Sequence, residues 1–178
     1  MGPPGAGKTH LAVAVLVELM ERVRVKGLFV EFTSLIHQIQ ATFDPGTLES
    51  KGQILESLSG AELLVLDELG AQQTTPWVRD ILYLIINNRY TRRLPTIFTT
   101  NYRFTESQGK KALGKGPAPK EENLDRGRDA EDESVWQETQ LSYRLPPMLI
   151  SRLYEMAQPI VLYSVEDFRR KNAGAHRR

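Results

Sequence analysis

Apolar residues recur every four positions in the first part of the chain, which is the spacing of one face of an α-helix. Leu11, Val15, Leu19 and Val23 follow this period. Neither glycine nor proline interrupts residues 8–24. The pattern therefore predicts a helix over residues 8–24.

Short apolar runs alternate with amphipathic stretches along the rest of the chain. The runs predict β-strands over residues 27–32, 63–68, 94–100 and 159–163. The amphipathic stretches predict helices over residues 33–43, 47–58, 77–92 and 148–156. Residues 63–66 are apolar at every position, as is typical of a strand buried on both faces. The alternation predicts an α/β fold around a parallel sheet of about four strands.

The hydrophobic pattern stops at Thr105. Residues 105–133 consist mainly of lysine, glutamate, aspartate, glycine and proline. A segment with so little to bury cannot offset the entropy that it would lose on ordering, so we expect a disordered polar insertion. The alternative is a basic arm for DNA made of Lys110, Lys111, Lys115 and Lys120, although the acidic residues that follow nearly cancel its charge. Residues 1–178 are otherwise expected to form a single domain.

Composition narrows the class of protein. The net charge of +1 gives no overall signature of nucleic-acid binding, so any DNA site would be a local patch. The sequence holds no cysteine, which excludes disulfides and thiolate metal sites. No apolar run has the length of a membrane span and no secretory signal is recognisable, so we expect a cytoplasmic protein that does not enter a membrane.

The first residues carry a candidate phosphate-binding loop. Gly2-Pro3-Pro4-Gly5-Ala6-Gly7-Lys8-Thr9 has the spacing G-x-x-x-x-G-K-[ST]. Its glycines let backbone N–H groups close around a phosphate at the start of the predicted helix. Lys8 can reach the β- and γ-phosphates, and Thr9 can bring a hydroxyl to Mg²⁺. Because such a loop normally follows a buried strand, and none precedes it here, we expect an N-terminally truncated domain.

Acidic and polar residues at the ends of later strands could complete this site. Asp67 can orient the hydration shell of Mg²⁺, and Glu68 can polarise the attacking water as general base. Asn101 follows the run over residues 94–100 and could sense the γ-phosphate or hold the water. Arg152, on the helix over residues 148–156, is a candidate arginine finger supplied across a subunit interface.

These motifs together resemble the DnaC-like replicative helicase loaders and the IstB-like transposition helper ATPases, a branch of the AAA+ superfamily. The likeness rests on GPPGAGKTHLA, LLVLDELG, NNRY before PTIFTTN, and SRLYEM, and it covers nearly all of the chain except the polar insertion. The resemblance implies a Walker A loop at Gly2 to Thr9 with His10 beside it, and Walker B at Asp67 and Glu68. It further implies sensor 1 at Asn101 and the arginine finger at Arg152.

By the same resemblance, the expected ligands are ATP and Mg²⁺. The expected partners are a replicative helicase, single-stranded DNA and further copies of the chain. Two alternatives within this class stay open, a transposition helper ATPase and an inactive truncated remnant. A P-loop kinase is a third alternative. Arg144 also competes with Arg152 for the finger role, because Pro146 and Pro147 interrupt the helix that would join them.

Overall fold

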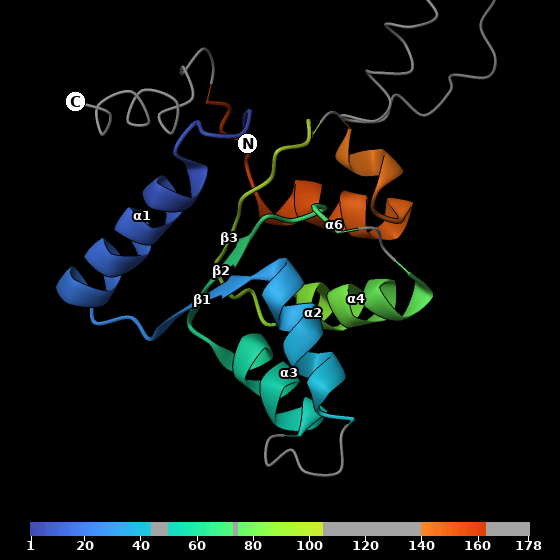
Figure 1. The fold of residues 1–178 in the computed structure, drawn as a ribbon. Helices are drawn as coiled ribbons and strands as arrows, with labels where there is room; N and C mark the ends of the chain where they lie inside the picture. The colour runs from blue at the N-terminus through green and yellow to red at the C-terminus, as the bar shows by residue number, and fades with distance from the viewer. Residues whose placement is uncertain (44–49, 73–74, 105–139, 163–178) are drawn as a thin grey trace, which may run out of the picture.

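Helices and strands alternate along the chain (Figure 1). The computed structural model describes residues 1–43, 50–72, 75–104 and 140–162. Its elements are α1 (Lys8–Arg22), β1 (Gly27–Glu31), α2 (Phe32–Ala41), α3 (Lys51–Gly60), β2 (Leu63–Asp67), α4 (Pro76–Thr91), β3 (Thr96–Phe98), the 3₁₀ turn η1 (Leu141–Tyr143) and α6 (Pro147–Met156).

The strands form a parallel sheet with β2 at its centre. The order is β1-β2-β3, and the register places Glu31 beside Asp67 and Leu66 beside Phe98. Parallel strands all end at the same edge of a sheet, and ligands of α/β proteins bind outside that edge. Asp67 and the residues after Phe98 therefore share the edge where a nucleotide would bind.

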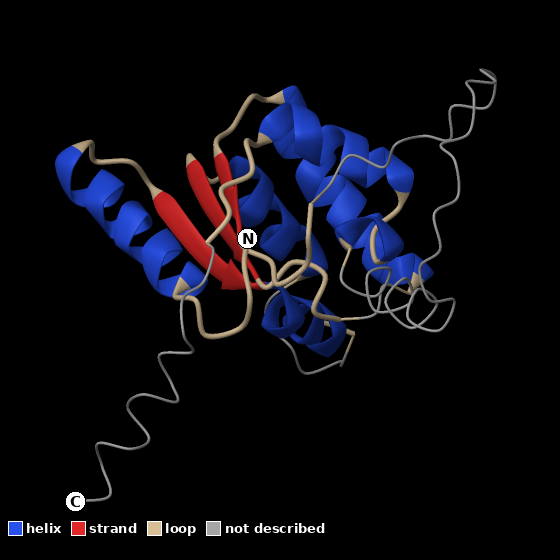
Figure 2. Ribbon diagram, turned by 90° about the horizontal axis from the view of Figure 1, so that it is seen from above, coloured by secondary structure: helices blue, strands red, loops and turns tan. Residues whose placement is uncertain are grey.

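Helices cover both faces of the sheet, with α1 alone on one side and α2, α3, α4 and α6 on the other (Figures 1 and 2). Side chains of β2 alternate between the two layers. Leu63 and Val65 pack with Ala12 and Leu16 of α1, while the side chains of Leu64 and Leu66 join the larger cluster. Every residue of β2 is buried, which explains why this strand is apolar at successive positions.

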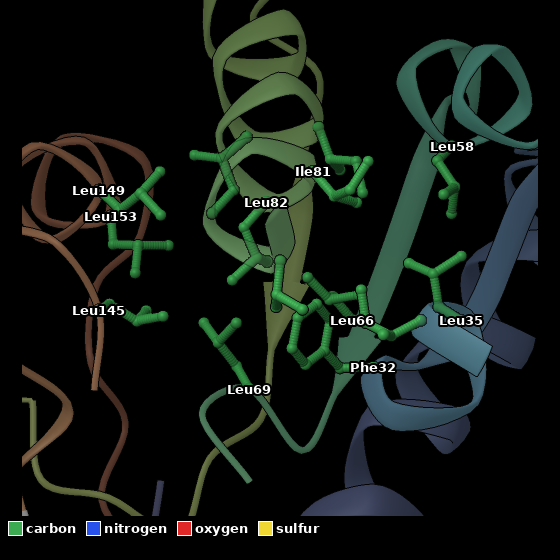
Figure 3. Packing of buried hydrophobic residues seen from close by; sticks show 14 of the residues in the cluster. Phe32, Leu35, Leu58, Leu66, Leu69, Ile81, Leu82, Leu145, Leu149 and Leu153 are labelled. Atoms are coloured by element: carbon green, nitrogen blue, oxygen red, sulfur yellow. The ribbon is translucent and has the colours of Figure 1, made fainter. Parts of the chain in front are cut away.

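The larger core fixes α6 against α4 within the same chain. Figure 3 shows Leu149 and Leu153 of α6 facing Leu82 of α4. On the other side of this cluster, Phe32 of α2 packs against Leu66 of β2. Both Phe32 and Leu66 are fully buried.

Local signals in the sequence set the starts of several helices. Pro76 occupies the first turn of α4, and the Thr75 hydroxyl accepts from the Val78 N–H. Helix α3 begins after Ser50, which forms a capping box with Gln53. Asp44-Pro45-Gly46 is a sequence typical of a turn. These residues, the first residues of the predicted helix 47–58, and the polar insertion over residues 105–133 lie outside the described residues.

Two strand predictions need correction. The strand predicted over residues 94–100 is limited to Thr96–Phe98. Residues 159–162 form no strand, and Tyr163 lies outside the described residues. Instead, the Leu162 N–H donates to the Met1 carbonyl at 2.9 Å. Strand structure requires a hydrogen-bonded ladder, and these residues have no neighbouring strand in the part of the chain that the structure describes.

An apolar cavity of about 410 Å³ lies between α1, β3 and residues 157–162. Leu11 and Val15 of α1 and Ile97 and Phe98 of β3 contribute to its lining. This cavity, rather than a fourth strand, borders the edge of β3 away from β2 in the described structure. Pro159, Ile160 and Leu162 also line this cavity, although Ile160 remains 69% exposed. Separately, none of the described helices has the length and apolarity needed to cross a membrane.

Candidate nucleotide-binding site

The glycine loop forms a tight turn that leads into α1. Gly5 and Gly7 have φ angles of 79° and 80°, in the left-handed region that glycine adopts most readily. The Ala6 N–H donates to the Pro3 carbonyl at 3.3 Å. Gly7 is the N-cap residue of α1, and no side chain caps the helix. The first N–H groups of α1 are thus available to an anion.

Lys8 lies over this loop. Its ammonium donates to the Pro3 carbonyl at 2.8 Å, so the positive charge of Lys8 lies against the backbone of the loop. A phosphate oxygen is a stronger acceptor for a cation than a neutral carbonyl, and Lys8 could exchange one for the other. His10 is exposed on the first turn of α1.

Thr9 and Asp67 connect the start of α1 to the end of β2. The Thr9 hydroxyl lies 3.1 and 3.0 Å from the two carboxylate oxygens of Asp67. Asp67 is only 3% exposed. Hydroxyl and carboxylate oxygens suit Mg²⁺, which commonly takes one or two protein carboxylates and completes its shell with phosphate oxygens and water. The residues present therefore fit a magnesium-bound nucleotide.

Glu68 follows Asp67 in an unusual backbone conformation. Its φ angle is 58°, in the left-handed region that residues other than glycine, asparagine and aspartate rarely adopt. Residues held in this region are over-represented at functional sites. Glu68 is half-buried, and its N–H donates to the Thr99 hydroxyl at 3.0 Å.

Thr99 is a residue that the sequence analysis missed. Its hydroxyl donates to Asp67 Oδ1 at 2.5 Å, and the side chain is buried just after β3. The signal was the pair of threonines after an apolar strand, but nothing local indicates which threonine faces Asp67. Asn101, which the sequence singled out instead, is exposed. Among the described residues, no hydrogen bond joins Asn101 to Asp67 or Glu68.

Glu31 ends β1 beside Asp67 but serves a structural purpose. Its carboxylate accepts from the N–H groups of Thr33 and Ser34, both at 2.7 Å, and so caps α2. Burial alone would raise the pKa of Glu31, but hydrogen bonds from Ser34 and Thr33 together lower it. This acid therefore stays ionised to a lower pH than usual. Its carboxylate oxygens are already engaged by the N–H groups at the start of α2.

Arg152 lies against α4 of its own chain. Its guanidinium donates to Asn87 Oδ1 and lies 4.7 Å from the ring centre of Tyr83 and 5.7 Å from that of Tyr90. A hydrogen bond to Glu155 raises the pKa of the Tyr90 hydroxyl.

Arg144 has a different environment. It donates to the Gly70 carbonyl at 3.2 Å and lies 4.2 Å from the ring centre of Tyr102. Gly70 is two residues after Glu68. The structure thus brings Thr9 and Asp67 together, with Glu68 next to them. Within the described residues, no hydrogen bond joins Arg152 to any of these three.

A glycine loop that opens a helix, with a hydroxyl and a buried carboxylate at the end of the adjacent parallel strand, defines a P-loop domain. Its helix-flanked parallel sheet is that of the AAA+ class. Residues 1–114 match the family described as IstB-like ATP binding protein. The chain therefore belongs to the IstB-like ATP-binding family, as the sequence motifs predicted.

Two curated relatives are a replication protein and a protein of a mobile element. The replicative helicase loader DnaC of Escherichia coli (strain K12) is 35% identical over 106 residues, which cover 59% of this chain and 42% of that protein. A protein of insertion sequence IS5376 of Geobacillus stearothermophilus, named as ATP-binding, is 33% identical over 106 residues, covering 60% and 40%. The matches thus span about two fifths of the length of these relatives.

Solved structures show the same fold. The crystal structure of the DnaC helicase loader has a TM-score of 0.64 and 31% identity, covering 90% of this chain and 75% of that one. AMPPCP-bound DnaA from Aquifex aeolicus has a TM-score of 0.62 at 14% identity, covering 98% of this chain and 43% of that one. The second likeness supports the fold alone. The predicted α/β fold of AAA+ type is confirmed.

Proposed function

We propose that the chain is an ATP-hydrolysing AAA+ domain that acts with a replicative helicase and single-stranded DNA. The observation that carries the ATPase part is the contact of the loop hydroxyl of Thr9 with the buried carboxylate of Asp67. This contact supports Thr9 and Asp67 as the pair that would hold Mg²⁺ where the phosphate loop meets the end of β2.

Each residue of the site has a distinct task in this proposal. The loop N–H groups and Lys8 bind the β- and γ-phosphates, with Lys8 leaving the Pro3 carbonyl to do so. Thr9 and Asp67 hold Mg²⁺, which when bound neutralises charge that builds up on the phosphates. Glu68 accepts a proton from the attacking water, and Asn101 helps to orient that water.

Substitution of Lys8 and Glu68 tests the ATPase part. Lys8→Ala should lose ATP binding, because the cation that compensates the phosphate charge is gone. Glu68→Gln should bind ATP but lose hydrolysis by about 10²–10⁴-fold, since an amide cannot accept the proton. Phosphate release and the affinity for a fluorescent ATP analogue measure the two effects separately.

The exposed Glu56 on α3 offers a matched control, since Glu56→Gln removes the same charge away from the loop. Hydrolysis by Glu68→Gln at the parent rate would show that Glu68 is not the general base. If Mg-ATP leaves the melting temperature of the parent unchanged, the alternative of an inactive remnant is favoured. A ligand that binds the folded state must stabilise that state.

The helicase-loading part is supported by the likeness to the DnaC loader in sequence and structure. It predicts that the chain binds the hexameric replicative helicase of the same organism. It also predicts that ATP changes the affinity of the chain for a labelled single-stranded oligonucleotide. Lys8→Ala should abolish the effect of ATP but not the fold. Fluorescence anisotropy and co-sedimentation would measure both interactions.

The insertion-sequence relative supports a second candidate, a transposition helper. That function predicts ATP-dependent association with a transposase, and no association with the helicase. Testing both partners in one co-sedimentation experiment separates the two functions.

A further inference from the structure

One hydroxyl group contacts both the carboxylate of Asp67 and the backbone of Glu68. Thr99 Oγ1 donates to Asp67 Oδ1 at 2.5 Å and accepts from the Glu68 N–H at 3.0 Å. A threonine hydroxyl has one hydrogen to donate and two lone pairs to accept with, so both bonds form together. Thr99 is 4% exposed and Asp67 is 3% exposed, so bulk water does not compete for these bonds.

The backbone of Thr99 also brackets Glu68. Its N–H donates to the Leu66 carbonyl at 3.1 Å, and its carbonyl accepts from the Leu69 N–H at 2.8 Å. Through its backbone and its hydroxyl, Thr99 thus forms hydrogen bonds with Leu66, Glu68 and Leu69. Glu68 has a left-handed φ of 58°, a conformation that persists only where surrounding contacts enforce it.

Asp67 receives two donors from different parts of the chain. Thr9 lies near both carboxylate oxygens, whereas Thr99 contacts Oδ1. The contact with Thr99 does not depend on the phosphate loop. It would therefore still restrain the rotation of the carboxylate if the Thr9 oxygen turned toward a metal ion.

We infer that Thr99 is a positioning residue for ATP hydrolysis, which aims the Asp67 carboxylate and holds Glu68 in its left-handed conformation. This inference rests on the proposed function, because it requires Asp67 and Glu68 to act on a magnesium-bound nucleotide. Thr99 contacts neither nucleotide nor water in this scheme and acts through the two acids.

Removal of the hydroxyl alone tests the inference. Thr99→Val keeps the β-branched shape and should lower kcat by about 10–100-fold, the usual loss when a group that orients metal ligands is removed. Thr99→Ser keeps the hydroxyl and should restore a rate close to that of the parent. Nucleotide affinity without Mg²⁺ should be unchanged in both variants, because the loop and Lys8 are intact.

A second readout does not depend on hydrolysis. The gain in ATP affinity on adding Mg²⁺ should be smaller in Thr99→Val than in the parent and in Thr99→Ser. If Thr99→Val does not fold, Thr99→Cys replaces it, since a thiol has similar size and is a much weaker donor.

Thr100 provides the matched control. It is 6% exposed, and its hydroxyl donates to the Leu69 carbonyl at 2.7 Å and accepts from the Tyr102 N–H at 3.1 Å. Thr100→Val therefore removes an equally buried hydroxyl that contacts neither acid. It should lower the melting temperature about as much as Thr99→Val, but leave kcat and the effect of Mg²⁺ unchanged.

The outcomes are distinguishable. If the parent hydrolyses ATP and Thr99→Val does so at the same rate, the inference fails while the proposed function stands. Equal losses of kcat in Thr99→Val and Thr100→Val would show a merely structural role and also overturn it. If the parent does not hydrolyse ATP, the ATPase proposal fails; an unchanged effect of Mg²⁺ on affinity in Thr99→Val would then overturn the role of Thr99 separately.

Discussion

At the scale of single residues, the most demanding side chain outside the site is Arg89, which is fully buried. Its guanidinium donates to the Thr96 hydroxyl and to the carbonyls of Leu58, Ala61 and Pro95, at 2.7–2.8 Å. Burial lowers the pKa of Arg89 to about 10, so the group remains a cation at neutral pH. These acceptors stand in for the water that the cation has lost.

Arg89→Lys should destabilise the fold although it keeps the charge. A lysine ammonium carries three donors at one point and cannot reproduce the planar fork that reaches four acceptors. Each buried carbonyl left without a donor costs about 1–3 kcal/mol, so the free energy of unfolding should fall by about 2 kcal/mol or more. Urea unfolding would measure the loss.

Arg22→Lys is the matched control, because Arg22 forms an exposed ion pair with Glu18 at the end of α1. The same substitution there should change the unfolding free energy by no more than about 0.5 kcal/mol. Equal stability of Arg89→Lys and Arg22→Lys would contradict the role assigned to the buried guanidinium.

The sequence predicted the roles of residues that belong to a local motif. It did not predict the roles of residues whose contacts are distant in the chain. The contact of Thr9 with Asp67 agrees with expectation, because the spacing of the glycine loop and the acids after β2 both identify them. Arg89 and Thr99 lie within the NNRY and PTIFTTN runs, but those runs did not indicate what either side chain contacts. Their roles follow from the register of β2 with β3 and from the packing of α3 on α4, which no local pattern encodes.

At the scale of elements, periodicity predicted where helices and buried strands lie but not where a strand has a partner. The all-apolar run over residues 63–66 became the fully buried β2, since only a central strand needs apolar residues on both faces. The equally apolar residues 159–162 line a cavity instead. An apolar run therefore fixes neither burial nor strand structure by itself, since Ile160 is 69% exposed and strand structure requires a neighbouring backbone.

Element boundaries depended on side chains that act as caps. Phe32 was predicted to end a strand, but it is the first residue of α2, because the Glu31 carboxylate accepts from the first N–H groups of that helix. Residues with acidic or hydroxyl side chains at the end of a strand therefore carried more information on the boundary than hydropathy did.

At the scale of the whole molecule, the position of Arg152 bears on whether copies of the chain act on one another. In the single chain it is held on α6 by Asn87, Tyr83 and Tyr90 of α4, and the core beneath fixes the two helices together. Arg152 is half-buried and has no hydrogen bond to Thr9, Asp67 or Glu68 among the described residues, so a role as arginine finger would require it to act on a neighbouring subunit. The further copies of the chain that the family resemblance leads us to expect would supply that neighbour.

Loss of Arg152 should then spare ATP binding and reduce hydrolysis by about 10³-fold or more, as is typical of an arginine finger. Mixing of two inactive variants gives a sharper test. Arg152→Ala retains the loop and Glu68, while Glu68→Gln retains the arginine. Mixed at concentrations that permit assembly, the two should regain part of the activity, because one variant supplies the arginine to the complete site of the other.

The control for this experiment is the same mixture with Arg144→Ala in place of Arg152→Ala. Arg144 contacts the Gly70 carbonyl just after Glu68 in its own chain, so its loss would impair the site from which it comes. Recovery with Arg152→Ala and none with Arg144→Ala would assign the finger to Arg152. A mixture of Arg152→Ala and Glu68→Gln that stays inactive, although sedimentation shows that the two assemble, would exclude action of Arg152 across the interface.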